Sequence, residues 1–388
     1  MATGFYSHAD CLLHDMGQWH PECPARLQAI EDQLIASHID ALIERESPPL
    51  ANEAALLRVH TQAHVDYIRS RSPVEGLAEI DPDTSMNPHT LQAALRAAGA
   101  AVAATDAVIE GHFDNAFCSV RPPGHHAEPA RAMGFCFFNN VAIAARHALE
   151  VHGLQRVAII DFDVHHGNGT EAAFSGDSRV LMCSFFQHPF YPFTGADNQA
   201  PNMCNVPMPA RSKGMAVREA VDLLWLPRLN EFKPEMLFIS ECFDAHREDD
   251  LGNMGLVEDD YVWITDQIRD IAKRYAGGLI VSCLWRAAIT CRRSGAAWSL
   301  TCARWPASER EPRSRCRDAL IEHTERANGR SERNQQTERA MNADAQNASL
   351  VTTETDAYGI PGVVRLTMNR PDGFNTLSEG CSTRCKPP

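Results

Sequence analysis

The chain has 388 residues, of which 44% are hydrophobic, 22% charged and 7% aromatic, a composition typical of globular proteins. No apolar run approaches the roughly 20 residues that cross a bilayer, so we expect no membrane insertion. The formal net charge of −14 argues against a protein that binds nucleic acid directly.

Cysteine usage and the N-terminal residues indicate the compartment. The chain begins MATGFYSHADCLLHDMG, with His and Asp where a signal peptide needs an unbroken apolar stretch, so we expect a cytoplasmic protein. The 13 cysteines form no CxxC pair and have no regular spacing. This pattern favours reduced thiols over a disulfide framework or a cysteine-ligated zinc site.

From Asn87 onward, helical and strand-like segments alternate. Residues 87–111 predict a helix with Asn87 as its cap, Pro88 in its first turn and Gly111 at its end. Residues 139–153 predict a second helix that stops at Gly153. Further helices are expected over 215–232, where Pro227 would kink or end the helix, and over 258–275.

Four short apolar runs have the length of buried strands. They are RVAIIDFD (156–163), RVLMCSFF (179–186), EMLFISECFD (235–244) and GLIVSCL (278–284). Strands that are apolar on both faces and alternate with helices predict an α/β fold, with a parallel sheet covered on both sides. Ligands of such sheets bind beyond the carboxyl ends of the strands.

Acidic residues stand at two of these strand ends. Asp161 and Asp163 end the first run and Asp244 ends the third, while His165 follows Asp163 by two positions. An Asp-x-His pair with a distant Asp supplies oxygen and nitrogen ligands and leaves positions open, as catalytic zinc requires. Taken alone, Asp244 is more often a helix cap or turn residue.

A pair of histidines lies in the segment RPPGHHAEPARAMGFCFFNN. His125 and His126 are held by a stiff Pro-Pro-Gly loop, and imidazole is suited to proton transfer near neutral pH. Taken alone, the pair reads as solvated loop histidines. The aromatic residues of GFCFF fit either an ordinary core or the wall of a narrow passage.

Four motifs, RPPGHHA, GFCFFNN, DFDVHHGNGT and FDAHREDDLG, resemble the zinc-dependent histone deacetylase family, in particular its class II and bacterial amidohydrolase branch. The segments HPECPARL and LLRVHTQAHVDYI extend the resemblance over about residues 1–284. It implies the arginase/deacetylase fold, truncated here at its C-terminal end, and hydrolysis of acetyl-lysine in a protein or of an acetylated polyamine.

The resemblance also implies a role for each motif residue. Asp163, His165 and Asp244 would bind Zn²⁺, and His126 would be the general base, with His125 beside it oriented by Asp161. Gly134, Phe135 and Tyr191 would line the channel for the acyl-lysine. A structural K⁺ site would use Asp161, Asp163, His165 and Ser184.

The chain departs from the family in two places. Relatives usually have Ala-Gly where this chain has Glu241 and Cys242. In the family, the last strand also leads into a Glu-Gly-Gly-Tyr-Asn loop, whose tyrosine donates a hydrogen bond to the oxyanion, whereas here Trp285, Arg286 and Ala287 follow. A codon series for Leu-Glu-Gly-Gly-Tyr-Asn-Leu-Ser-Ala, read one base later, encodes residues 285–293, so we interpret this stretch as frameshifted.

The remaining chain fits that interpretation. Residues 285–340 contain twelve arginines, seven acidic residues and no lysine, without hydrophobic periodicity, so we expect no packed core there. A disordered basic arm that binds nucleic acid is the rival interpretation. Residues 341–388 resemble the start of an enoyl-CoA hydratase (crotonase), and this fragment is too short to function.

The sequence therefore predicts a zinc amidohydrolase domain over residues 1–284, impaired by loss of the tyrosine. A zinc-holding pseudoenzyme that binds acyl-lysine without turnover is the alternative, and a chain that does not fold stably is a third possibility. The sequence does not indicate an oligomeric state.

Overall fold

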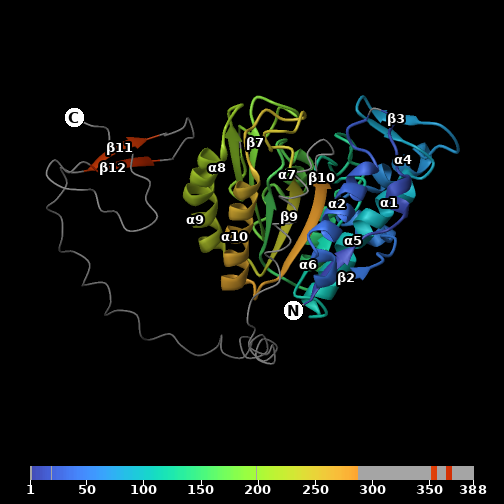
Figure 1. Cartoon of the computed structure of the whole chain (residues 1–388), viewed down its shortest axis with the longest axis horizontal. Helices are drawn as coiled ribbons and strands as arrows, with labels where there is room; N and C mark the ends of the chain where they lie inside the picture. The colour runs from blue at the N-terminus through green and yellow to red at the C-terminus, as the bar shows by residue number, and fades with distance from the viewer. Residues whose placement is uncertain (1, 19, 198, 287–350, 356–363, 369–388) are drawn as a thin grey trace. The chain divides into compact units, whose positions relative to one another are not determined.

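A computed structural model describes residues 2–18, 20–197, 199–286, 351–355 and 364–368 (Figure 1). They belong to two units, residues 1–309 and 310–388. In the second unit, β11 (Val351–Thr355) and β12 (Val364–Met368) form an antiparallel pair. The predicted frameshifted segment lies almost wholly outside the described residues, as does most of the crotonase-like segment, so both stay predictions.

The first unit is built on a sheet of eight parallel strands, in the order β2-β1-β5-β10-β9-β6-β7-β8. The strands are β1 (Thr3–Tyr6), β2 (Ile43–Glu46), β5 (Asn115–Cys118), β6 (Val157–Asp161), β7 (Val180–Gln187), β8 (Met203–Met208), β9 (Met236–Cys242) and β10 (Ile280–Arg286). Every residue of β6, β7 and β9 is buried, as expected for strands covered on both faces.

Helices lie on both sides of this sheet, with α8, α9 and α10 on one side and α5 and α6 on the other (Figure 1). The longer helices are α2 (Ala25–Ala36), α4 (Gln62–Arg71), α5 (Thr90–Ile109), α6 (Asn140–Glu150) and α10 (Glu258–Tyr275). The shorter ones are α1 (Asp10–Leu13), α3 (Glu53–Leu57), α7 (Asn168–Phe174), α8 (Gly214–Ala220), α9 (Leu226–Phe232) and the 3-10 turn Ile39–Leu42. A hairpin of β3 (Ala78–Asp81) and β4 (Thr84–Met86) completes the unit. Among the helices described, none is both long and apolar enough to cross a bilayer.

The predicted helices form, and one of them begins later than expected. Helix α5 begins at Thr90 and not in the residues after Asn87, because the Asn87 side chain accepts hydrogen bonds from the backbone of His89 (3.1 Å) and from the Thr90 hydroxyl (3.0 Å). These bonds make a turn before the helix. Asn139 caps α6 as its position suggests, since its side chain accepts from the backbone N–H of Ala142.

The helical segment 215–232 is irregular in the turn before Pro227, the residue that the sequence predicts to kink or end it. A π-helical turn, Val221–Trp225, separates α8 from α9, and Pro227 is the second residue of α9. Proline has no N–H to donate to the preceding turn, and a wider turn accommodates that loss without breaking the helical path.

Candidate active site

The candidate site lies at the carboxyl ends of two neighbouring strands. Asp161 is the last residue of β6, Asp163 and His165 follow it, and Asp244 stands two residues beyond the end of β9. Strands β6 and β9 are paired in parallel, with Asp161 opposite Ser240. Their ends therefore meet at one edge of the sheet, and the three acidic residues lie on that edge.

Asp163, His165 and Asp244 converge on one point. His165 Nδ1 lies 2.9 Å from Asp163 Oδ1 and 3.1 Å from Asp244 Oδ2. Backbone N–H groups hold both carboxylates, that of His165 donating to Asp163 Oδ1 (2.6 Å) and that of Val164 to Asp244 Oδ1 (2.8 Å). These bonds join the loops after β6 and β9, so the three side chains are fixed relative to one another.

This cluster concentrates acidic groups away from solvent, where burial and the neighbouring Asp244 raise the pKa of Asp163. Asp163 and Asp244 are both fully buried, and two buried carboxylates repel each other unless a cation lies between them. Burial lowers the pKa of His165, but its hydrogen bonds to the two carboxylates outweigh burial and raise the pKa to about 10. Asp163 Oδ2 is buried and accepts no hydrogen bond from any described residue. The two oxygens and one nitrogen fit a catalytic metal with open positions.

His125 borders this cluster and is held by a carboxylate. Its Nδ1–H donates to Asp161 Oδ2 over 2.9 Å, and its Nε2 lies 3.9 Å from Asp163 Oδ2. Burial lowers its pKa, but the charges of Asp161 and Asp163 outweigh burial, and the net shift is upward. Gly167 leaves room for this pair, since a Cβ there would lie 2.6 Å from Asp161 Oδ2.

His126 is held by a neutral partner that the sequence analysis did not single out. Asn168 Oδ1 accepts from His126 Nδ1 at 2.7 Å, and the amide of Asn168 donates to Glu128 Oε1 at 2.8 Å. Burial and the neighbouring His125 and His165 keep the pKa of His126 well below its usual value. Asn168 lies in the motif DFDVHHGNGT, and its place in that motif is the sequence feature that could have identified it as a site residue.

Two of the three predicted channel residues, Gly134 and Tyr191, contact the His126 ring, and Phe135 follows Gly134 in the chain. Gly134 has a φ of +57°, and a Cβ on it would approach His126 Cδ2 to 2.4 Å, so the ring packs against the bare glycine. The ring of Tyr191 meets His126 edge-on, with centroids 5.2 Å apart. Phe135 adopts a φ of +69°, and its backbone N–H donates to the Thr84 hydroxyl. Phe135 and Tyr191 are half-buried.

Ser184 lies on the strand next to Asp161. The two residues are register partners on β7 and β6, and Ser184 is buried with its hydroxyl 3.2 Å from Asn205 Oδ1. The residues predicted to surround a potassium ion therefore lie at the end of β6 and on the neighbouring strand β7.

The two substituted residues of β9 are both buried. Ser282 donates to Glu241 Oε2 at 2.8 Å, whereas Glu241 Oε1 accepts no hydrogen bond from the described residues. Burial raises the pKa of this carboxyl to about 7. A thiol follows at Cys242, with its sulfur within 4.8 Å of carboxylate oxygens of Asp163 and Asp244. Glu241 thus turns inward and Cys242 lies beside the acidic cluster.

The end of β10 reaches the same site. Leu284 and Cys283 line a small pocket together with His125 and Gly124. In members of the family that the chain resembles, the residues after this strand begin the loop that carries the oxyanion-binding tyrosine. The backbone of Trp285 and Arg286 continues β10, while their side chains and Ala287 lie outside the described part of the chain.

Residues 20–284 match the histone deacetylase domain. The chain belongs to the histone deacetylase family. Its sheet and helices have the arginase/deacetylase fold of that family. The solved structure described as the HDA15 HD domain is similar, with a TM-score of 0.73 and 31% identity, covering 79% of this chain and 91% of that one.

Two relatives of this histone deacetylase family member have names that state an activity. The histone deacetylase-like amidohydrolase of Pseudomonas aeruginosa is 35% identical over 303 residues, which cover 72% of this chain and 80% of the relative. The polyamine deacetylase HDAC10 of Rattus norvegicus is 34% identical over 305 residues, covering 73% of this chain and 51% of the relative. Family membership makes this chain a deacetylase-type hydrolase.

Proposed function

We propose that the chain hydrolyses acetylated amines, either acetyl-lysine in a protein or an acetylpolyamine, at a zinc site formed by Asp163, His165 and Asp244. The observation that carries the proposal is the convergence of these three side chains beside His125 and His126. A zinc ion bound there would polarise the acetyl carbonyl and lower the pKa of a water molecule.

The two histidines have different partners and therefore different roles. Because the carbonyl oxygen of Asn168 accepts from His126 Nδ1, the lone pair of His126 lies on Nε2 and is available to take a proton from the attacking water. Asp161 holds His125 at Nδ1 and favours its protonated form. Water adds to the carbonyl carbon, the amide C–N bond breaks, and the proton held by His126 passes to the leaving amine. The products are acetic acid and an amine, which exchange a proton to give acetate and an ammonium ion.

The substrate would enter between Phe135 and Tyr191. A lysine side chain or polyamine has an alkyl stem that half-buried aromatic rings can flank, and Gly134, which has no side chain, takes up little of the space beside the His126 ring. Potassium would bind at Asp161, Asp163, His165 and Ser184, where it would stabilise the β6 and β7 ends. The crotonase-like segment has no part in this reaction.

A zinc-holding pseudoenzyme is the second candidate. The proposed ligands and both histidines precede residue 284. The family's tyrosine that donates a hydrogen bond to the oxyanion has no counterpart here, where Trp285, Arg286 and Ala287 follow. Such a chain would bind metal and acyl-lysine and turn over little.

One preparation separates these outcomes. Bound zinc is measured by mass spectrometry for the full chain and for Asp244→Asn, and turnover is measured with an acetyl-lysine peptide and an acetylpolyamine. Zinc that depends on Asp244, together with turnover, supports the hydrolase. The same zinc without turnover supports the pseudoenzyme. Equal zinc in both chains would overturn the ligand assignment, and the preferred substrate would distinguish the two amine classes.

A further inference from the structure

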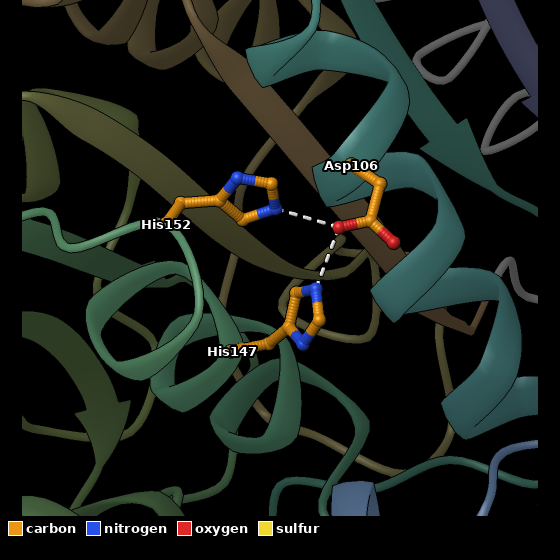
Figure 2. A group of neighbouring side chains, drawn as sticks. All are labelled: Asp106, His147 and His152. Carbon is orange, nitrogen blue, oxygen red and sulfur yellow. Dashed lines mark hydrogen bonds and ion pairs between the residues drawn. The ribbon is translucent and has the colours of Figure 1, made fainter.

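A second cluster of metal-binding side chains lies away from the candidate active site. Asp106 on α5, His147 near the end of α6 and His152 in the turn after α6 meet at one point (Figure 2). His147 Nε2 and His152 Nε2 each lie 2.6 Å from the same oxygen, Asp106 Oδ1. All three potential ligand atoms are within 4.8 Å of one another.

The local structure fixes this arrangement. His147 is in the last turn of α6, and Gly153 has a φ of +71°, which turns the chain directly after His152. The two imidazole rings meet edge-on, with centroids 5.3 Å apart. Figure 2 shows both rings pointing at Asp106 from the end of α6 and its following turn.

The environment suits an ion more than a simple hydrogen-bonded triad. Only one imidazole is needed to pair with Asp106, yet the Nε2 atoms of two imidazoles face the same carboxylate oxygen. His147 Nδ1 is buried and has no hydrogen-bond partner among the described residues, so no bond at Nδ1 in the described part of the chain fixes its Nε2 as the protonated nitrogen. The Asp106 side chain is 39% exposed, so an ion can enter and keep a water ligand. Two imidazoles and a carboxylate are the borderline donors that Zn²⁺, Co²⁺, Ni²⁺ and Cu²⁺ prefer.

We propose that Asp106, His147 and His152 form a second binding site for a divalent transition-metal ion. On binding, the proton of each neutral imidazole shifts from Nε2 to Nδ1, so that the Nε2 lone pair faces the ion, and the nitrogen–oxygen separations open from 2.6 Å to about 3.3 Å, the ligand spacing of tetrahedral zinc. The side chains need to move by less than 1 Å, on the order of a rotamer adjustment.

The position of the site gives it a structural role. Helix α6 has 11 residues, about 16 Å at 1.5 Å per residue, and its opposite end is held by Asn139, whose amide donates to the backbone oxygen of Ala127 beside His126. The ion therefore does not touch the reacting atoms. It joins α5 to the end of α6 and to the chain that enters β6, and so stabilises the sheet that carries the active site.

The test uses the full chain and four proteins: the unsubstituted chain, Asp106→Asn, His152→Gln and the control His112→Gln, which changes an exposed histidine just after α5. Each is saturated with Zn²⁺ and dialysed, bound zinc is counted by mass spectrometry, and circular dichroism checks folding. We expect the Asp106 and His152 variants to lose one zinc equivalent, and the control to lose none.

Metal bound at the candidate active site does not confuse this comparison, because all four proteins retain Asp163, His165 and Asp244. In an Asp244→Asn background, added Zn²⁺ should still raise the unfolding temperature, and Asp106→Asn should abolish that rise. Equal zinc in all four proteins, or a Zn²⁺ response independent of Asp106, would overturn the second site without affecting the proposed hydrolase.

Discussion

Asn168 Oδ1 lies 2.7 Å from His126 Nδ1, and this contact fixes which nitrogen of His126 carries a proton. Glu128 fixes the orientation of the Asn168 amide in turn, because its carboxylate accepts from the amide nitrogen. The geometry of the proposed general base therefore depends on two residues that do not contact the substrate carbonyl.

Replacing Asn168 should affect the rate and its pH dependence in different ways. Asn168→Ala removes the acceptor and should lower kcat by about 10- to 100-fold, part of what a general base contributes. Asn168→Asp keeps an acceptor but adds a charge that raises the pKa of His126. In this variant, the acidic limb of the plot of kcat/KM against pH should move to higher pH, because His126 must be neutral to accept a proton. Turnover of trifluoroacetyl-lysine measures both the rate and its pH dependence. An unchanged pH profile for Asn168→Asp would contradict the role of His126 as the general base held by Asn168.

Gly134→Ala should damage the site directly. The new Cβ would lie 2.4 Å from His126 Cδ2, and a φ of +57° strains any side chain, so we expect at least about a tenfold loss of kcat and about 1–3 kcal/mol of stability. Gly176→Ala is the matched control, because Gly176 has a φ of +83° but open space around it. It should lose stability and keep its kcat, and equal rate losses in both variants would refute the packing argument.

Glu241→Gln should stabilise the protein at high pH. The pKa of Glu241 rises to about 7 on burial, so the folded state binds a proton that the unfolded state has released. Stability should then fall as pH rises from about 4.5 to about 7, by up to about 3 kcal/mol. Urea unfolding should show a gain for Glu241→Gln at pH 8 and almost none at pH 4. Glu44→Gln, which changes an exposed residue of β2, is the control, and a pH-independent gain at Glu241 would contradict a buried ionisation.

Restoring the reading frame from Leu284 should raise acetyl-lysine turnover by at least about a hundredfold. One missing oxyanion donor typically costs about 10² to 10³ in rate, and the corrected sequence regains Gly-Gly-Tyr and the final helix. Trifluoroacetyl-lysine should gain less, because its activated carbonyl depends less on that donor. If the uncorrected chain already matches the corrected one, the tyrosine role and the frameshift interpretation are both wrong.

Much of the fold follows from local patterns in the sequence. The all-apolar runs around Ile159 and Phe238 predict strands of a parallel sheet, and both form fully buried strands. Helix α10 begins and ends where its pattern predicts. Strand β8 was not predicted, since Asn205 and Pro207 interrupt its apolar run, and pairing with β7 supplies the stability that its own residues do not signal.

The candidate site could be predicted where acidic residues follow a strand end and where two histidines follow a stiff loop. Asp163 and Asp244 could be placed together because parallel strands end at one edge of the sheet. Asn168 and the Asp106 cluster depend on packing between elements far apart in the chain, and no periodicity marks them. The inward direction of Glu241 likewise follows from the register that sets Glu241 opposite Leu284 on β10.

Strand β10 has a consequence for how the chain is assembled during synthesis. It is the last of the eight strands to leave the ribosome, yet it lies at the centre of the sheet, between β5 and β9. Until it emerges, the nascent protein consists of two half-sheets, each with an unsatisfied edge that invites aggregation. Residues 280–284 complete nearly all of the pairing with β9, and they end where the proposed change of frame begins. A change of frame a few codons earlier would leave the two half-sheets unjoined, so under the proposed frameshift the position of the change decides whether the sheet is completed.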